Sequence, residues 1–127
     1  MQNEIWKDIT GFPGYQVSNK GRVKSIARIV KRGNHTMRIP EKMLRFGTSS
    51  GYPFVNLRKD GKSISIKVHR LVAIEFVSNP QNRPEIDHIN TIRQDNRSDN
   101  LRWVNRHENN MNPLTRQKMS ISKTKKK

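Results

Sequence analysis

The segment from Glu85 to Asn112 constrains the fold more than any other part of this 127-residue chain. Within it, short apolar runs around Ile86 and from Leu101 to Val104 are bounded by polar residues, a pattern typical of strands. Asn105 follows the second run and Glu108 stands three residues later, which predicts a helix N-cap with a capping box. The segment therefore predicts a strand, a long loop, a second strand and a helix.

Polar residues fill the loop, residues 90–99, between these two predicted strands. We expect the loop on the surface, with Asn96 and Asp99 making local hydrogen bonds from side chain to backbone. Such a loop would bring together residues that are distant in the sequence.

Four polar side chains stand where this arrangement could gather them: the pair Asp87 and His88 before the loop, Asn100 after it, and Asn109 in the first turn of the predicted helix. Asn100 lies twelve residues beyond His88, and Asn109 lies twenty-one beyond it. Neighbouring side chains of a regular strand point to opposite faces, so Asp87 and His88 share a site only if the strand ends or twists there. Each residue alone would be an ordinary turn or capping group. Together they predict one site.

The motifs DHIN, DNRSDNLRWVN and EN resemble the HNH nuclease motif of phage and intron-encoded homing endonucleases, which share the ββα-metal (His-Me finger) fold. The resemblance implies that Asp87 and Asn109 hold a divalent metal, that His88 activates water and that Asn100 orients His88. The third motif position is histidine in many members and Asn109 here, which argues for an oxygen-only metal shell.

The chemistry of these residue types agrees with that resemblance. Phosphodiester hydrolysis needs a base for the attacking water and a cation for the charge on the phosphate and the leaving oxygen. A neutral histidine suits the first task, since its unperturbed pKa is roughly 6.5. Carboxylate and amide oxygens suit Mg²⁺ or Mn²⁺, with one ion expected per active site. The alternative is a non-catalytic DNA-binding or regulatory protein that keeps the fold; the complete set of four residues argues against it.

Charge indicates a polyanionic partner, because the formal net charge is +16. Residues 1–50 carry ten basic and three acidic groups, whereas residues 80–112 carry five of each. The remaining excess is +3 in residues 51–79 and +6 in residues 113–127. Basic flanks around a neutral motif segment would grip DNA phosphates and leave the motif carboxylate available for metal.

The N-terminal part predicts a hairpin, with strands at residues 15–17 and 22–26 joined by a turn in which Gly21 supplies a positive φ. Residues 4–26, with WKDI, GYQVSN and GRVKS, resemble the NUMOD-type module that precedes the HNH domain in many phage homing endonucleases and is thought to bind DNA. An ordinary solvated strand face is the alternative for any single basic residue. The candidate DNA contacts are Arg22, Lys24, Arg28, Lys67, Arg70 and Arg102.

A second hairpin is predicted at residues 52–57 and 63–68, with Ile64 and Ile66 on a buried face, followed by a core helix over residues 68–77 that includes Ile74. His69 opens this helix, and a structural hydrogen-bonding group is the favoured interpretation over a catalytic one. Residues 31–48 show little periodicity and are left unassigned, as a flexible or DNA-ordered loop.

The expected fold class is α+β: a small antiparallel β-rich DNA-binding module at residues 1–50, an HNH nuclease domain at 51–112, and a basic tail at 113–127 that begins as a short helix. The absence of cysteine excludes disulfides, and no segment has the length of a membrane span or the core of a signal peptide. We expect a cytoplasmic protein, in the host cell if phage-encoded. A single site per chain favours a monomeric nicking enzyme acting on double-stranded DNA, with a dimer possible and no protein partner evident.

Overall fold

The computed structural model describes residues 3–110. They form three short helical segments and eleven strands, and all of the strands belong to four small antiparallel sheets. The elements are β1 (Trp6–Asp8), β2 (Tyr15–Ser18), β3 (Val23–Ser25), β4 (Arg28–Arg32), β5 (His35–Ile39), β6 (Lys42–Met43), β7 (Gly47–Ser49), β8 (Tyr52–Lys59), β9 (Lys62–Lys67), α1 (Val68–Phe76), β10 (Glu85–His88), the 3₁₀ turn η1 (Ser98–Asn100), β11 (Leu101–Val104) and α2 (Arg106–Asn110). The helix and tail expected beyond residue 112 lie outside the described residues.

The first sheet has the order β1-β2-β3-β6 and contains the hairpin predicted near the N-terminus. Val17 pairs with Val23 across β2 and β3, and both side chains are fully buried. Gly21 closes the turn with φ +87°, a conformation that L-residues with a Cβ rarely adopt. The predicted hairpin and its glycine turn are confirmed.

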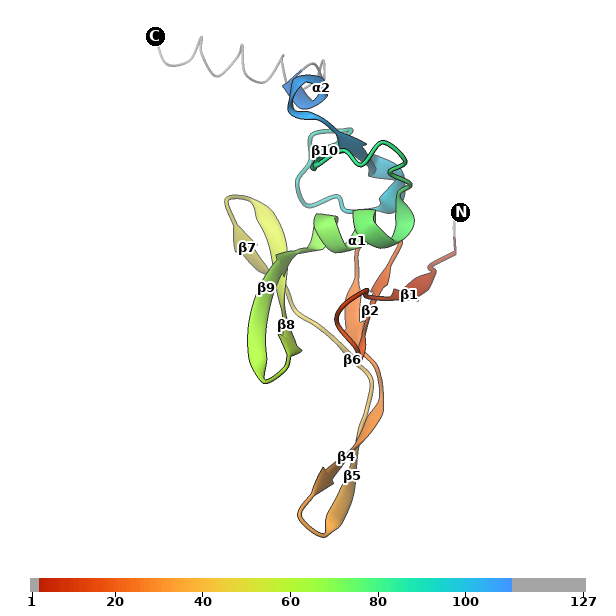
Figure 1. The fold of residues 1–127 in the computed structure, drawn as a ribbon, viewed down its shortest axis with the longest axis vertical. Coiled ribbons are helices and arrows are strands. Elements are labelled where there is room, and N and C mark those ends of the chain that lie inside the picture. Colours follow the sequence, from red (N-terminus) through yellow and green to blue (C-terminus); the bar gives the residue numbers. More distant parts are fainter. Residues whose placement is uncertain (1–2, 111–127) are drawn as a thin grey trace.

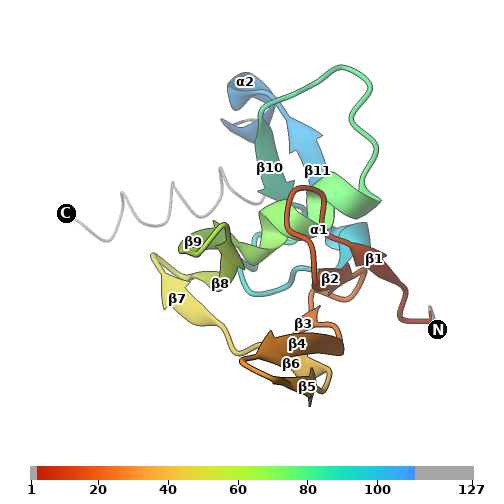
Figure 2. The ribbon, with the colours of Figure 1, turned by 60° about the horizontal axis from the view of Figure 1, so that its bottom comes forward.

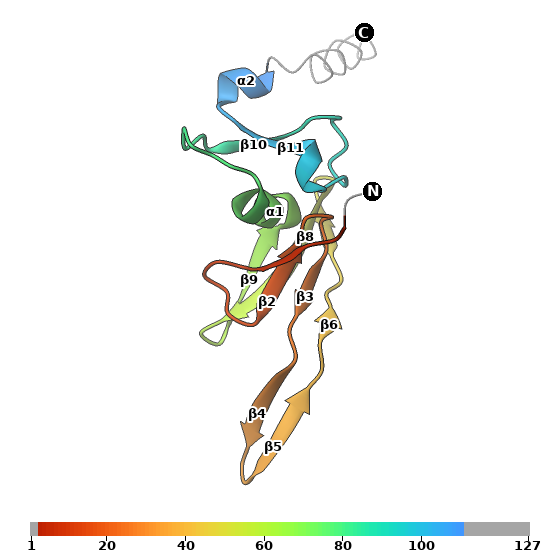
Figure 3. The ribbon, with the colours of Figure 1, turned by 90° about the vertical axis from the view of Figure 1, so that its right-hand side faces the viewer.

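The segment left unassigned as a loop, residues 31–48, is instead largely strand. β4 and β5 pair from Arg28↔Ile39 to Arg32↔His35 and project from the body as a long ribbon (Figures 1 and 3). The sequence interpretation was wrong here because neither face of the ribbon is buried, so no alternation of apolar and polar residues marks it. Ile29 is 74% exposed on this ribbon.

The third sheet, β7-β8-β9, contains the second predicted hairpin, which leads directly into α1. Its buried face comes from Val55 and Leu57 of β8, whereas Ile64 of β9 is 38% exposed. The expectation of a buried β9 face was therefore wrong for Ile64. In α1, Ile74 is 52% exposed, so the apolar stripe of the helix is narrower than predicted.

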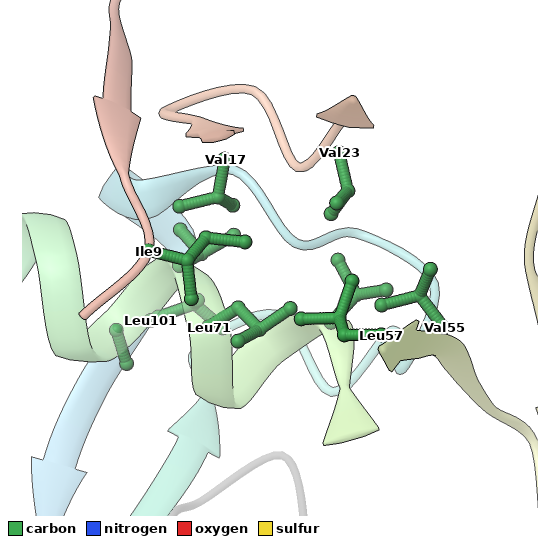
Figure 4. Packing of buried hydrophobic residues seen from close by; sticks show 10 residues of the cluster. Ile9, Val17, Val23, Val55, Leu57, Leu71 and Leu101 are labelled. Atoms are coloured by element: carbon green, nitrogen blue, oxygen red, sulfur yellow. The ribbon is translucent and has the colours of Figure 1, made fainter. Parts of the chain in front are cut away.

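The hydrophobic core is one cluster that gathers side chains from the N-terminal strands, β8, α1 and β11 (Figure 4). β1–β3 and the loop after β1 supply Ile9, Val17 and Val23, and α1 faces them (Figure 4). The members are Ile9, Val17, Val23, Val55, Leu57, Val68, Leu71, Val72, Ala73 and Leu101. The N-terminal strands and the C-terminal motif therefore share their apolar interior.

The C-terminal segment has the predicted order of strand, loop, strand and helix. β10 and β11 pair antiparallel, with His88 opposite Leu101, and α2 follows at their end (Figure 2). α1 lies between this unit and the β-rich part (Figure 3). The α+β ββα architecture is confirmed. None of the helices between residues 3 and 110 has the length or apolar character that crossing a bilayer requires.

Candidate active site

His88 is the last residue of β10 and is buried, with 6% of its surface exposed. The chain turns immediately afterwards, since the N–H of Thr91 donates to the carbonyl of His88 at 2.8 Å. Asp87, at 4% exposure, is buried beside it. The strand thus ends at the Asp87–His88 pair, which is the condition that the sequence analysis set for these two side chains to share a site.

The ring of His88 is held by Asn96, whose Oδ1 lies 2.7 Å from Nε2. An amide oxygen only accepts, so Nε2 donates in this contact and Nδ1 is the ring nitrogen that can act as a base. Asn96 is itself buried, at 5% exposure, rather than a surface residue bonded to the local backbone. That expectation was wrong, because nothing in a polar loop pattern distinguishes an asparagine that points inward.

Asn100 fixes the loop rather than the ring. Its Oδ1 accepts from the N–H of Asn90 at 3.0 Å, and its Nδ2 donates to Asn90 Oδ1 at 2.9 Å and to the carbonyl of Asp95 at 2.8 Å. These bonds close residues 90–95 on themselves directly after His88. Asn100 therefore shapes the path of the chain beyond the histidine, while Asn96 contacts the histidine itself.

Asp87 accepts a hydrogen bond at 2.9 Å from Nε of Arg102, its cross-strand partner in β11. A buried carboxylate is costly without a positive partner, so this pair offsets the cost of burying Asp87 and fixes its orientation. Arg102, a candidate DNA contact in the sequence, is thus already engaged at the site. The residues described contain no group of three histidine, cysteine, aspartate or glutamate side chains arranged for metal.

An oxygen-only metal shell of the predicted kind needs fewer such residues. The buried Asp87 carboxylate supplies a hard oxygen donor of the type that Mg²⁺ and Mn²⁺ prefer. The predicted second ligand, Asn109, lies in α2, and its side chain is outside the described residues. The donor chemistry of Asp87 therefore fits a divalent ion.

The predicted capping box fixes the start of α2. Asn105 Oδ1 accepts from the N–H of Glu108 at 2.8 Å, and Glu108 Oε1 accepts from the N–H of Asn105 at 3.2 Å. Arg83 Nη1 donates to the other Glu108 oxygen at 2.7 Å. The box and this ion pair together hold the helix that carries Asn109, which confirms the predicted start of the helix.

His69 of α1 faces His88, with their ring centroids 5.0 Å apart in an edge-on arrangement. Burial, together with the nearby His88, Lys67 and Arg70, lowers the pKa of His69 to about 4. Its Nδ1 is buried without a hydrogen-bond partner among the described residues. His69 is therefore an uncharged ring that packs against the His88 ring. In this part of the chain its Nδ1 does not make the structural hydrogen bond that the sequence interpretation favoured.

The turn between β2 and β3 packs against the loop between β10 and β11. Gly21 lies so close to Asn96 that a Cβ added at Gly21 would be 3.1 Å from the Cβ and the carbonyl oxygen of Asn96. The N–H of Ser98 also donates to the carbonyl of Asn19 at 2.8 Å. The N-terminal hairpin thus supports the residue that holds His88.

The other candidate DNA contacts fall into two groups. Arg22 binds Glu4 through two guanidinium nitrogens, and Lys24 pairs with Glu41 at 3.0 Å with its side chain only 13% exposed. Arg28, Lys67 and Arg70 are exposed, and none of them forms an ion pair within residues 3–110. The second group is therefore the better placed to meet phosphates.

Two family descriptions match the chain: "NUMOD4 motif" over residues 4–58 and "HNH endonuclease" over residues 67–111. Among curated relatives, DNA endonuclease I-HmuI of Bacillus phage SP01 is 38% identical over 121 residues, 93% of this chain and 62% of the relative. An HNH endonuclease of Acanthamoeba polyphaga mimivirus is 41% identical over 113 residues, 85% of this chain and 25% of the relative. The chain thus spans less than two thirds of the length of these relatives.

A solved structure, described as DNA binding and cleavage by the HNH homing endonuclease I-HmuI, also matches. The TM-score is 0.69 at 35% identity, covering 96% of this chain and 68% of that one. The likeness extends over nearly all of the fold described above, including both the β-rich part and the ββα unit. This chain belongs to the HNH endonuclease family.

Proposed function

We propose that this protein is a metal-dependent DNA endonuclease that hydrolyses phosphodiester bonds, with His88 as the general base. The observation that carries the proposal is the 2.7 Å contact between His88 Nε2 and Asn96 Oδ1. It leaves Nδ1 as the basic nitrogen of a buried ring, and the next residue back along β10 is the buried Asp87. A base and a carboxylate on adjacent residues at a strand end are what water activation at a phosphate requires.

Each group at the site has a separate task. His88 Nδ1 takes a proton from the attacking water, and Asn96 Oδ1 stabilises the imidazolium that results because it continues to accept from Nε2. Arg102 holds the Asp87 carboxylate in one orientation. Asn100 keeps the loop after His88 closed. A divalent ion, Mg²⁺ or Mn²⁺, held by Asp87 and Asn109 would neutralise charge on the phosphate and the leaving oxygen.

DNA binding is assigned to the basic β4–β5 ribbon and the exposed cations near the site. The sequence from Ile9 to Pro40 contains no carboxylate, and Arg28, Lys31, Arg32 and Arg38 lie on or beside the ribbon strands. A two-stranded ribbon fits the major groove of B-DNA. Arg22 and Lys24 are weaker candidates, since carboxylates already neutralise them.

The proposed organisation follows from these assignments. Residues 1–50 form the DNA-binding module, residues 51–112 the nuclease domain, and residues 113–127 a basic tail. One site per chain favours a monomer that nicks one strand, as a homing-type enzyme acting in the cytoplasm of a phage host. Phage endonucleases among the relatives support that setting.

The test is conversion of supercoiled plasmid to open circles, in Mg²⁺, in Mn²⁺ and in EDTA. Wild type should nick with either ion and stop in EDTA. His88→Ala should lose nicking by about 10²-fold or more while retaining DNA affinity, since general-base catalysis contributes roughly 10²–10⁴-fold. Gln81→Ala, on an exposed turn between α1 and β10, should still nick. Linear product would indicate paired sites, and a mobility shift without cutting would establish a binding protein instead.

A further inference from the structure

The ring of Tyr52, the first residue of β8, lies beside His88 with positive charge around it. Lys67 Nζ is 4.7 Å from the centre of the ring, and Arg93 Cζ is 4.8 Å from it. The same ring is 6.0 Å from the His88 ring and 5.2 Å from the His69 ring, centre to centre. Tyr52 thus connects two cations from different segments to the proposed general base.

These two cations differ from three arginines in the same part of the chain. Arg102 is bonded to Asp87, Arg97 to Asp95, and Arg83 to Glu108. In the part of the chain that the structure describes, neither Lys67 nor Arg93 forms an ion pair with a carboxylate. Their positive charge is therefore not neutralised by the protein.

Arg93 is also held in place, which a solvated surface arginine is not. Its Nη1 donates to the carbonyl of Ser50 at 2.7 Å, and the neighbouring Gln94 donates to the carbonyl of Gly51 at 2.8 Å. Gly51 allows this approach because it lacks a Cβ, which would stand 3.3 Å from Arg93 Cδ and Nη1. One of the five N–H donors of the guanidinium is used in this way, so others remain for a ligand.

We propose that Arg93 and Lys67, supported on the Tyr52 ring, form a phosphate-binding element beside His88 that positions the DNA strand to be cut. The inference rests on the proposed nuclease function and names residues for it beyond the HNH motif. The ligand is a backbone phosphate next to the scissile one. An unpaired arginine fork and a lysine suit a phosphate.

The rings between the cations and His88 set the spacing of this element. Burial lowers the pKa of His69 to about 4, so the His69 ring adds no positive charge beside Tyr52. The cations that contact the Tyr52 ring are Lys67 and Arg93. A DNA strand whose phosphate binds there would present its next phosphate near the His88 ring. The phosphate-binding element would not itself place a cation in competition with the metal at Asp87.

The first experiment compares Arg93→Ala with Lys62→Ala, a loss of the same charge at the start of β9, far along the hairpin from Tyr52. Nicking is measured under saturating enzyme, and binding of a fluorescent 30-base-pair duplex is measured in EDTA across a salt series. Arg93→Ala should lower the saturated nicking rate by about 10-fold or more, and should reduce the slope of log Kd against log salt by about 1. Lys62→Ala should leave the nicking rate at that of wild type.

A second pair tests the ring. Tyr52→Leu should lower the nicking rate as Arg93→Ala does. Tyr52→Phe should lower the nicking rate much less than Tyr52→Leu, because phenylalanine keeps the aromatic face. Circular dichroism melting shows whether either variant fails to fold. Arg93→Ala, on an exposed side chain, carries no such risk.

The readouts separate this inference from the proposed function. If the wild-type protein binds DNA but does not nick it, the nuclease proposal fails. The slope of log Kd against log salt for Arg93→Ala then still decides whether Arg93 contacts a phosphate. Equal slopes for Arg93→Ala and wild type would overturn the phosphate contact. A wild-type nicking rate for Arg93→Ala at saturation, or an equal loss in Lys62→Ala, would overturn the positioning role.

Discussion

Replacing Gly21 with alanine should impair cleavage through Asn96, although Gly21 is not part of the site. The new Cβ would stand 3.1 Å from the Cβ and carbonyl oxygen of Asn96, against an optimal separation of roughly 3.5–4.0 Å between carbon atoms. Asn96 must therefore move by a few tenths of an ångström and carry its Oδ1 away from His88. A backbone φ of +87° also strains any residue other than glycine.

These two costs can be separated by a matched variant. Gly14 has φ +90° and nothing within 4 Å of an added Cβ, so Gly14→Ala carries the backbone strain of roughly 1–2 kcal/mol without the contact. Gly21→Ala adds overpacking against Asn96, of about 1–3 kcal/mol. The difference between the two melting curves measures the contact alone.

Cleavage should distinguish the variants more sharply than stability does. Since a misplacement of about 1 Å at a catalytic group costs about 10²-fold, the smaller shift of Asn96 should lower nicking by about 10-fold in Gly21→Ala. Gly14→Ala should nick at nearly the wild-type rate, and both should bind duplex DNA similarly in EDTA. Equal nicking rates for the two folded variants would refute the idea that the hairpin turn supports His88 through Asn96.

Two further predictions concern the residues around His88. Asn96→Ala should lower the nicking rate by about 10- to 100-fold, and Asn96→Asp, which keeps an acceptor for Nε2, should retain more activity; equal rates for both would contradict the proposed hydrogen bond. His69 should make stability depend on pH: its pKa falls from about 6.5 unfolded to about 4 folded, so the unfolded state binds its proton first as pH falls. Stability should be full above about pH 6.5 and decline by about 2–3 kcal/mol, after discounting for partial exposure, as pH approaches 4. The melting temperature of His69→Gln should be flatter over that window, and a wild-type decline in this variant would assign the effect to other groups.

The motif region was predictable because its local signals agree with one another. The strands on either side of the polar loop are marked by apolar runs, and the capping box at Asn105 and Glu108 fixes the start of α2 by two hydrogen bonds within four residues. Such features depend on neighbours in the sequence. The family resemblance added the roles of the residues, which neither spacing nor composition supplies.

The contacts of the site could not be predicted, because they depend on which side of a loop each side chain occupies. Asn96 and Asn100 stand four positions apart in one polar segment, yet only Asn96 contacts the His88 ring. Gly21, which presses on Asn96, is seventy-five positions away in the sequence. A polar pattern carries no information about such distant packing.

The β4–β5 ribbon was missed for a related reason. Alternation of apolar and polar residues in a sequence indicates a strand with one buried face. A ribbon that projects into solvent has no buried face, so its sequence lacks this alternation. Its strands form through pairing with each other from Arg28↔Ile39 to Arg32↔His35. The absence of a hydrophobic pattern indicated exposure correctly, but exposure was interpreted as a loop.

The shared interior shown in Figure 4 limits how members of this family can be recombined. Ile9, Val17 and Val23 each contribute roughly 1.5–3 kcal/mol by burial against α1 and β8, in a fold whose total stability is on the order of 5–15 kcal/mol. A chimaera that takes its first fifty residues from another enzyme therefore inherits three of the ten residues of the core cluster as well as a new DNA contact surface. Target preference and folding are inherited together, and a graft would succeed only between parents whose interior side chains have compatible shapes.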